Sequence, residues 1–144
     1  MTQSITQLPH TRVITGAAAE QELHAMGLIP SNLTRSCVEG LQSAVISYSS
    51  FEPVIAFGIS IWSKIVGALR KQLNEEDWKH HDIANAPRSV SPDGTMAIAA
   101  VGGDSQTAHA NGNPRNVHLK GPKFANEIEN NAAKSSAPRY TQCR

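Results

Sequence analysis

The feature that most constrains the fold is the stretch 53–73, which reads as one long and unusually apolar helix. Pro53 has a fixed φ and no backbone donor to lose, which suits the first turn of a helix. Up to Trp62 the apolar residues occupy every face, and after Lys64 they narrow to one stripe. A helix that is apolar all round needs protein on most of its sides. We therefore expect the rest of the chain to enclose residues 53–73.

The same stretch is too short and too interrupted to predict a membrane span. Its most apolar part, 54–66, contains Gly58, two serines and Lys64, whereas a span needs about 20 predominantly apolar residues. The first residues of the chain have neither a basic start nor an apolar run of the length found in signal peptides. We therefore expect a cytoplasmic protein that makes no contact with a membrane.

Two further helices are predicted before the central one. Thr15 can cap a short helix over 15–26, and Gly27 is suited to end it. Ser31 or Asn32 can cap a second helix. The apolar residues of that helix recur at helical spacing: Leu33, Cys37, Leu41, Ala44, Val45 and Tyr48.

The second helix and the central helix are predicted to form a hairpin. The turn between them, 48–52, is short, which favours antiparallel packing of the two helices. Within the second helix, Cys37 is expected to be a small buried apolar residue. Gly40 weakens this helix by about 1 kcal/mol relative to alanine, unless a close helix crossing needs the space.

After Trp78 the pattern changes from helical to extended. Residues 85–90 and 95–101 flank Ser91-Pro92-Asp93-Gly94, whose residue types fit a type I turn, so the sequence predicts a β-hairpin. Both alternating sets in 95–101 are apolar, which is typical of a strand covered on both faces or lying in the middle of a sheet. Residues 78–83 lead into the first strand or form part of it, and a third short strand is possible at 116–119.

The predicted fold class is α+β. A helical hairpin and a short N-terminal helix pack on a small antiparallel sheet of two or three strands, and a C-terminal helix over 123–133 closes the structure. The length suits one domain, which we place at 1–134 with a loosely ordered lead-in over 1–14. Residues 135–144 read as a flexible tail.

Charge gives no general reason to expect a nucleic acid partner. The formal net charge is +1, although the C-terminal third is basic, with Arg115, His118, Lys120 and Lys123 forming its one periodic run. Such donors suffice for phosphate contact, but base stacking needs exposed aromatic side chains, which are scarce there. Nucleic acid binding through this third is therefore kept as an alternative.

The most suggestive chemical cluster combines histidines and aspartates. His81 and Asp82 precede the predicted hairpin and Asp104 follows it, so the hairpin could bring them together. Imidazole and carboxylate serve metal binding and acid–base catalysis alike. However, His81 follows His80, and adjacent side chains on a strand point to opposite faces, so at most one of these two histidines can face a given site. The sequence also contains no established metal-binding or nucleophile motif. We expect no metal, no cofactor and no catalytic residue, and keep a small metal-dependent or hydrolytic enzyme using His81, Asp82 and Asp104 as an alternative.

One resemblance to known proteins rests on the order of the segments. The Ser91-Pro92-Asp93-Gly94 turn, Gly102-Gly103-Asp104 after it, and Lys120-Gly121-Pro122 before a terminal helix resemble small uncharacterised proteins of bacterial genomes and their phages. The likeness covers roughly 53–133, and none of its motifs is specific to an activity. It implies an accessory protein of a mobile element, such as an inhibitor that binds a host defence complex, and it implies no catalytic residues.

The sequence thus favours a non-enzymatic binding or inhibitor protein that acts on a protein partner. Loops on a rigid scaffold commonly carry recognition, which directs attention to the polar segment after the sheet. The binding residues that we predict are Asp104, His109, Asn113, Arg115, His118, Lys120 and Lys123. Self-association through apolar helix faces is a further possibility.

Overall fold

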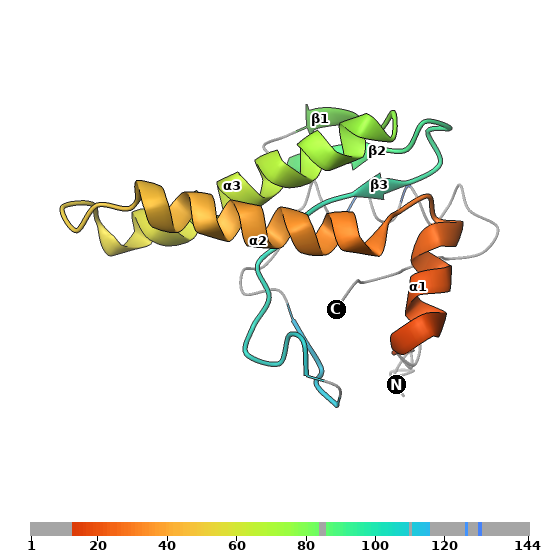
Figure 1. Cartoon of the computed structure of the whole chain (residues 1–144), viewed down its shortest axis with the longest axis horizontal. Helices are drawn as coiled ribbons and strands as arrows, with labels where there is room; N and C mark the ends of the chain where they lie inside the picture. Colours follow the sequence, from red (N-terminus) through yellow and green to blue (C-terminus); the bar gives the residue numbers. More distant parts are fainter. Residues whose placement is uncertain (1–12, 84–85, 110, 116–125, 127–129, 131–144) are drawn as a thin grey trace, which may run out of the picture.

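The computed structural model describes residues 13–83, 86–109, 111–115, 126 and 130 (Figure 1). Its elements in chain order are α1 (Gly16–Ala25), α2 (Pro30–Ser47), α3 (Val54–Glu75), β1 (Lys79–Ile83), β2 (Ala86–Val90) and β3 (Ala97–Ile98). The predicted α+β class is therefore confirmed. The predicted lead-in, the strand at 116–119, the helix over 123–133 and the tail lie wholly or largely outside the described residues.

Helices α2 and α3 form the predicted hairpin and run side by side in opposite directions (Figure 1). Pro53 is the N-cap of α3, and its carbonyl accepts a hydrogen bond from Ala56 N at 2.8 Å. The expected start of α2 was wrong, because the helix begins at Pro30 rather than after a Ser31 or Asn32 cap. A proline at the first helical position loses no hydrogen bond and already has the helical φ.

The buried side of α2 consists of small residues, of which Ala44 belongs to the predicted apolar face, whereas Leu41, Val45 and Tyr48 of that face are exposed. Ser36, Gly40 and Ala44 are buried, at intervals of four residues. A β-carbon placed on Gly40 would lie 2.5 Å from Ile65 Cα, so the two helix backbones approach closely at this point. Small residues permit such an approach, and the larger apolar residues of α2 are consequently displaced to its outer sides. Cys37, expected to be buried, is exposed.

The sheet is antiparallel and has the strand order β1-β2-β3. Ser89 pairs with Ile98 and Val90 with Ala97 across the 91–94 turn, so the predicted β-hairpin is confirmed. Residues 79–83 form a strand of their own, which pairs with β2 on its other side.

The expectation for 95–101 was wrong in two respects. Its regular strand is limited to Ala97 and Ile98, and it lies at the edge of the sheet with Ala97, Ala99 and Val101 exposed. The carbonyl of Ala100 accepts a hydrogen bond from Trp62 Nε1 at 3.1 Å, so the chain leaves the sheet and passes over α3.

The hydrophobic core sits at one end of the hairpin. Leu28, Leu73 and Trp78 are buried together. The partly buried residues packed against them come from α1 and its linker, from α3 and from the hairpin that ends in β3: Leu23, Met26, Leu69, Met96 and Ile98. The core is therefore built where the second half of α3 meets the sheet and the chain around Leu28.

The central expectation, that residues 53–73 are enclosed by the rest of the chain, was wrong. Gln72 and Leu73 are the buried residues of α3, whereas Val54, Ile55 and Ile59 are exposed. Figure 1 shows the reason: the sheet and α1 cover one end of the hairpin, and its other end projects away from them. A three-stranded sheet with a two-residue third strand is too small to cover the full length of α3.

Candidate functional site

The projecting end of the hairpin continues an apolar face that the core covers only in part. On α3 this face recurs at intervals of four and three residues: Ile55, Ile59, Trp62, Val66, Leu69 and Leu73. Leu73 is 3% exposed and Leu69 packs on the core, whereas Ile55 is 73% exposed. One side of a single helix therefore passes from core to solvent along its length.

Helix α2 adds a second exposed row to the same side of the hairpin. Val38, Leu41 and Val45 are exposed and follow one another at helical spacing. Around the α2 axis they are rotated from Gly40 and Ala44, which face α3. Ile55, Ile59 and Trp62 are rotated in the same sense around the α3 axis from Ile65, which faces α2. Because the two helices run antiparallel, both rows lie on one side of the pair. We name these six residues the apolar stripe.

The opposite side of the hairpin is polar. A shallow groove between the two helices is lined by side chains of both, and its lining supports the assignment of the two sides. The lining residues are Glu39, Ser43, Ser63, Lys64, Gly67, Ala68 and Lys71. Along this groove the hairpin is thus a two-helix layer with one polar and one apolar side, while Ile46 near the end of α2 is exposed outside the stripe.

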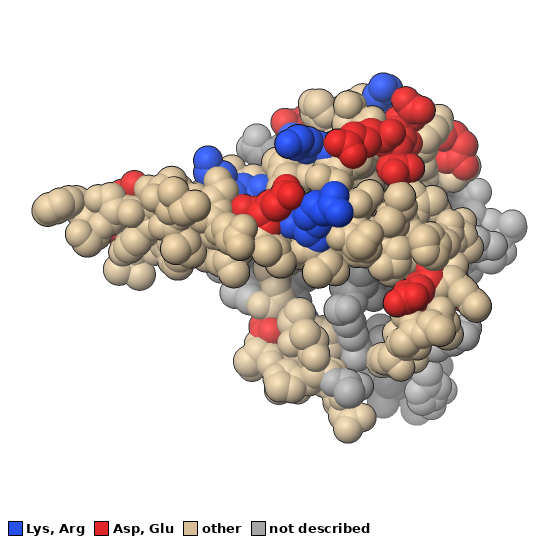
Figure 2. Space-filling view, in the orientation of Figure 1, with Lys and Arg blue, Asp and Glu red and all other residues tan. Residues whose placement is uncertain are grey.

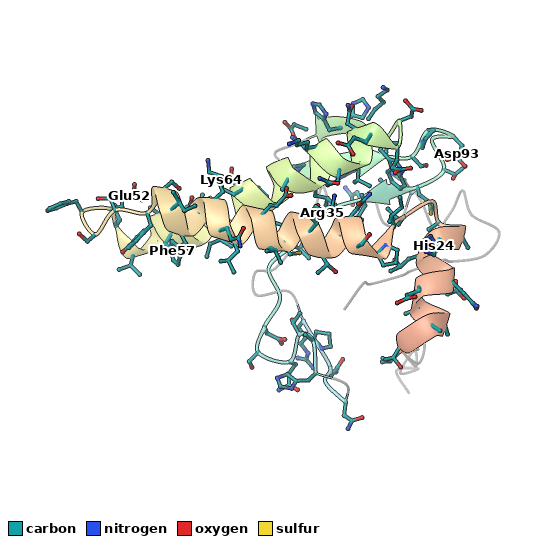
Figure 3. All side chains as sticks on the ribbon, viewed as in Figure 1. His24, Arg35, Glu52, Phe57, Lys64 and Asp93 are labelled. Carbon is teal, nitrogen blue, oxygen red and sulfur yellow. The ribbon has the colours of Figure 1, made fainter. Side chains whose placement is uncertain are left out.

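The connection between the helices exposes further apolar residues. Phe51 is 97% exposed and Val54 nearly as much, and we name these two residues the apolar tip. The turn behind Phe51 is held locally, since Phe51 N donates to Ser49 Oγ at 3.3 Å and Glu52 N donates to the Ser49 carbonyl at 3.0 Å. The rings of Tyr48 and Phe57 also contact across the hairpin, with centroids 4.8 Å apart. Figure 3 labels Phe57 and Glu52 at this end of the hairpin.

Charge is nearly absent from this end of the molecule. Between Gly40 and Ser63 the sequence contains a single charged residue, Glu52. In Figure 2 the projecting end is almost wholly free of blue and red, whereas charged side chains gather over the rest of the hairpin and around the sheet. The sequence indicated self-association through apolar helix faces as a possibility, but the run 53–73 was assigned to the core and no binding residue was predicted at this end. The long interval without charge could have indicated a contact surface.

The first predicted site residues, His81 and Asp82, lie on β1 and are exposed. His81 is opposite Arg88 in the sheet register. Asp82 Oδ1 accepts a hydrogen bond from Arg70 of α3, which forms an ion pair with it. This hydrogen bond and the charge of Arg70 lower the pKa of Asp82 below its ordinary value. The carboxylate of Asp82 therefore links β1 to α3 through Arg70, and we assign Asp82 a structural role.

Asp104 does not join that pair. It lies in the segment after β3, which hangs on the far side of α2 from β1 in Figure 1. There Asp104 N donates to the Arg115 carbonyl at 3.0 Å, and Asp104 Oδ1 accepts a hydrogen bond from Gln106 N at 3.0 Å. Among the described residues, no group of three or more His, Cys, Asp or Glu side chains is placed to hold a metal ion.

The other predicted binding residues are only partly described. His109 is exposed and lines an open depression with Gln106, Asn111 and Gly112. Asn113 and Arg115 are exposed nearby. His118, Lys120 and Lys123 lie outside the described residues. Binding through this set stays a prediction.

The comparisons with known proteins provide no family for the chain. No protein-family model matches it, and neither the curated proteins nor the solved structures contain a match. Within the described residues, none of the helices has the length and apolarity required to cross a membrane. What the chain does must therefore be argued from the exposed end of its hairpin.

Proposed function

We propose that this protein is a non-enzymatic binding protein that holds a protein partner against the apolar stripe and the apolar tip. The observation that carries the proposal is the exposure of Phe51, Val54 and Ile55 on a well-formed helical hairpin. A fully exposed aromatic side chain offers roughly 150–250 Å² and an aliphatic one somewhat less, so stripe and tip together expose on the order of 1,000 Å². The largest apolar patch on a typical monomer is about 300–600 Å².

The arrangement of this surface suits a partner that offers apolar helices. Ile55, Ile59 and Trp62 are spaced as the residues that interlock in helix–helix packing are spaced, and the row on α2 widens the surface to two helices. The hairpin is anchored at its other end by the core around Leu73. A rigid, preorganised surface of this kind loses little conformational entropy on binding.

The distribution of charge favours a protein over a lipid surface. Segments that lie on membranes combine an apolar face with lysine and arginine on their polar side. Here the one charged residue near the tip is Glu52, which is acidic, and the lysines of the polar groove, Lys64 and Lys71, lie well behind it along α3. An acidic tip is repelled by anionic lipid headgroups, whereas a protein partner can leave Glu52 at the solvated rim of the interface.

Site-specific photo-crosslinking in the producing cells tests the proposal. A photoreactive amino acid at Ile55 or Ile59 is expected to give a discrete protein adduct. The same amino acid at Ile46 is expected to give none, although Ile46 is 85% exposed, because it lies away from the stripe. Adducts of equal yield from Ile46 and Ile55, adducts with lipid, or no adduct from the stripe would each contradict the proposal.

The remaining predictions about the partner follow from the resemblance and not from this surface. A host defence complex as target stays a prediction, and the crosslinked adduct would identify the partner directly by its peptide masses. The enzymatic alternative requires His81 and Asp82 to lie close to Asp104. The strand that contains the first two residues and the segment that contains Asp104 lie on opposite sides of α2. Nucleic acid binding through 115–123 predicts an affinity that falls steeply with salt.

A further inference from the structure

We infer that the partner on the apolar stripe is a second copy of this chain, so that two hairpins pack stripe to stripe as a four-helix bundle of two layers. The inference rests on the proposed function, since it names the partner for the same surface. Its carrying observation is that the two rows, Val38 to Val45 on α2 and Ile55 to Trp62 on α3, are exposed. Their helical spacing places them on one side of the hairpin, where Trp62 at the inner end of its row also donates to the Ala100 carbonyl.

A surface with this arrangement is self-complementary. In a two-fold dimer each residue of the patch meets a residue of the same patch on the other copy, so the patch must match itself in shape and charge. The stripe is apolar on both helices and has no charged member. The two copies therefore meet without opposing like charges, and Glu52 remains at the end of the hairpin rather than within the stripe. Antiparallel helix pairs with rows at this spacing are the building units of four-helix bundles.

The exposed area agrees with what a dimer requires. Stable interfaces bury about 800 Å² on each partner, and stripe and tip together offer on the order of 1,000 Å², so the dimer interface includes the tip as well as the stripe. The polar groove on the other side, which contains Glu39, Lys64 and Lys71, would remain in contact with water. A single layer of two helices with one apolar side thus becomes a two-layer bundle with its apolar residues inside and its charges outside.

The mass of the purified full-length chain in solution tests the inference. Light scattering or sedimentation equilibrium is expected to give twice the chain mass of 15.5 kDa at micromolar concentrations. The double variant Ile55→Ser/Ile59→Ser is expected to dissociate roughly 30-fold more readily or more. The control Ile46→Ser replaces a still more exposed isoleucine outside the stripe and is expected to keep the dimer. Circular dichroism verifies that both variants remain helical.

Each other result overturns the inference. A monomer at about 100 μM, which is a hundredfold above a micromolar dissociation constant, excludes a specific dimer of this kind. A dimer that survives the double variant, or that Ile46→Ser also dissociates, places the contact elsewhere. A monomer that sediments with vesicles of phosphatidylglycerol and phosphatidylcholine assigns the stripe to lipid.

The proposed function and the dimer can fail separately. If the chain is monomeric but the photoreactive group at Ile55 still gives an adduct with a different protein, the dimer is wrong and the binding function stands. If the chain is monomeric and Ile55 gives no adduct, both are wrong. An adduct of twice the chain mass that contains peptides of this chain alone is the result that the inference expects.

Discussion

Gly40 of α2 lies against the backbone of Ile65 in α3, with no room for a β-carbon between them: one placed on Gly40 would be 2.5 Å from Ile65 Cα and 2.6 Å from Ile65 N. Glycine at this position costs helix stability, by about 1 kcal/mol relative to alanine. The cost is offset because the two helices pack closely enough to form a rigid hairpin. This contact and the Tyr48–Phe57 ring contact join the two helices of the projecting end, which the sheet does not cover.

Gly40→Ala is expected to destabilise the protein even though alanine favours helices. Relieving the overlap with Ile65 would require the helices to separate, and overpacking of this kind costs about 1–3 kcal/mol. Gly67→Ala is the matched control, because a β-carbon on Gly67 meets nothing within 4 Å. That variant is expected to be neutral or to stabilise by up to about 1 kcal/mol. Urea denaturation followed by circular dichroism measures both, and equal effects of the two variants would contradict the close packing.

Leu73→Ala is expected to lower the free energy of unfolding by about 2–5 kcal/mol, since it leaves a cavity beside Leu28 and Trp78 in the core. Ile46→Ala removes a similar side chain from an exposed position of α2 and is expected to change stability by less than about 0.5 kcal/mol. Thermal or urea unfolding of the two variants against the parent protein makes the comparison. A large loss for Ile46→Ala would mean that the exposed side of α2 is covered in solution.

The ion pair between Arg70 and Asp82 predicts a dependence of stability on pH. The hydrogen bond from Arg70 lowers the pKa of Asp82 in the folded protein below its ordinary value of 3.8, so the unfolded chain takes up the proton more readily. The contribution of the pair is therefore fully present above the unfolded pKa and is lost as the pH falls through the folded pKa. Asp82→Asn should lower the unfolding free energy near neutral pH and have progressively less effect as the pH falls below about 4.

A double-mutant cycle separates this pair from other acid effects. In the presence of Arg70→Gln, the change Asp82→Asn is expected to have little further effect at neutral pH, because the interaction has already been removed. High salt should weaken the effect of the single variant, since Asp82 is exposed to solvent. Additive losses from the two substitutions would show that the pair does not fasten β1 to α3.

Asp93 is expected to hold the turn between β2 and β3. Its Oδ1 accepts hydrogen bonds from Ser91 Oγ at 2.6 Å and from Thr95 N at 3.0 Å, and these bonds lower the pKa of its carboxyl. Asp93→Ala should therefore loosen the turn and accelerate hydrogen exchange at Ser91 N, which donates to the Met96 carbonyl at 2.9 Å. Thr95→Val keeps the backbone donor and should have a smaller effect. Exchange measured by NMR would contradict this role if both variants matched the parent.

The sequence by itself determined the elements whose causes are local. The 3.6-residue period predicted the helices, the short connection predicted the antiparallel hairpin, and Ser91-Pro92-Asp93-Gly94 predicted the turn that joins β2 to β3. Each of these depends on residues that are neighbours in the chain, through backbone dihedral preferences and hydrogen bonds that span a few residues. The sequence also predicted a polar loop around Asp104, and the structure has such a loop, with hydrogen bonds between its own residues.

Only the tertiary structure decided which apolar residues are buried. The periodicity of α3 is the same at Ile55 and at Leu73, yet one is in solvent and the other in the core. The difference arises because burial depends on what covers a face, and the sheet and α1 reach only one end of the hairpin. Cys37 is exposed for a second reason: α2 packs on α3 through Ser36, Gly40 and Ala44, and which face of a helix meets its neighbour is a property of the packed pair and not of the local sequence pattern.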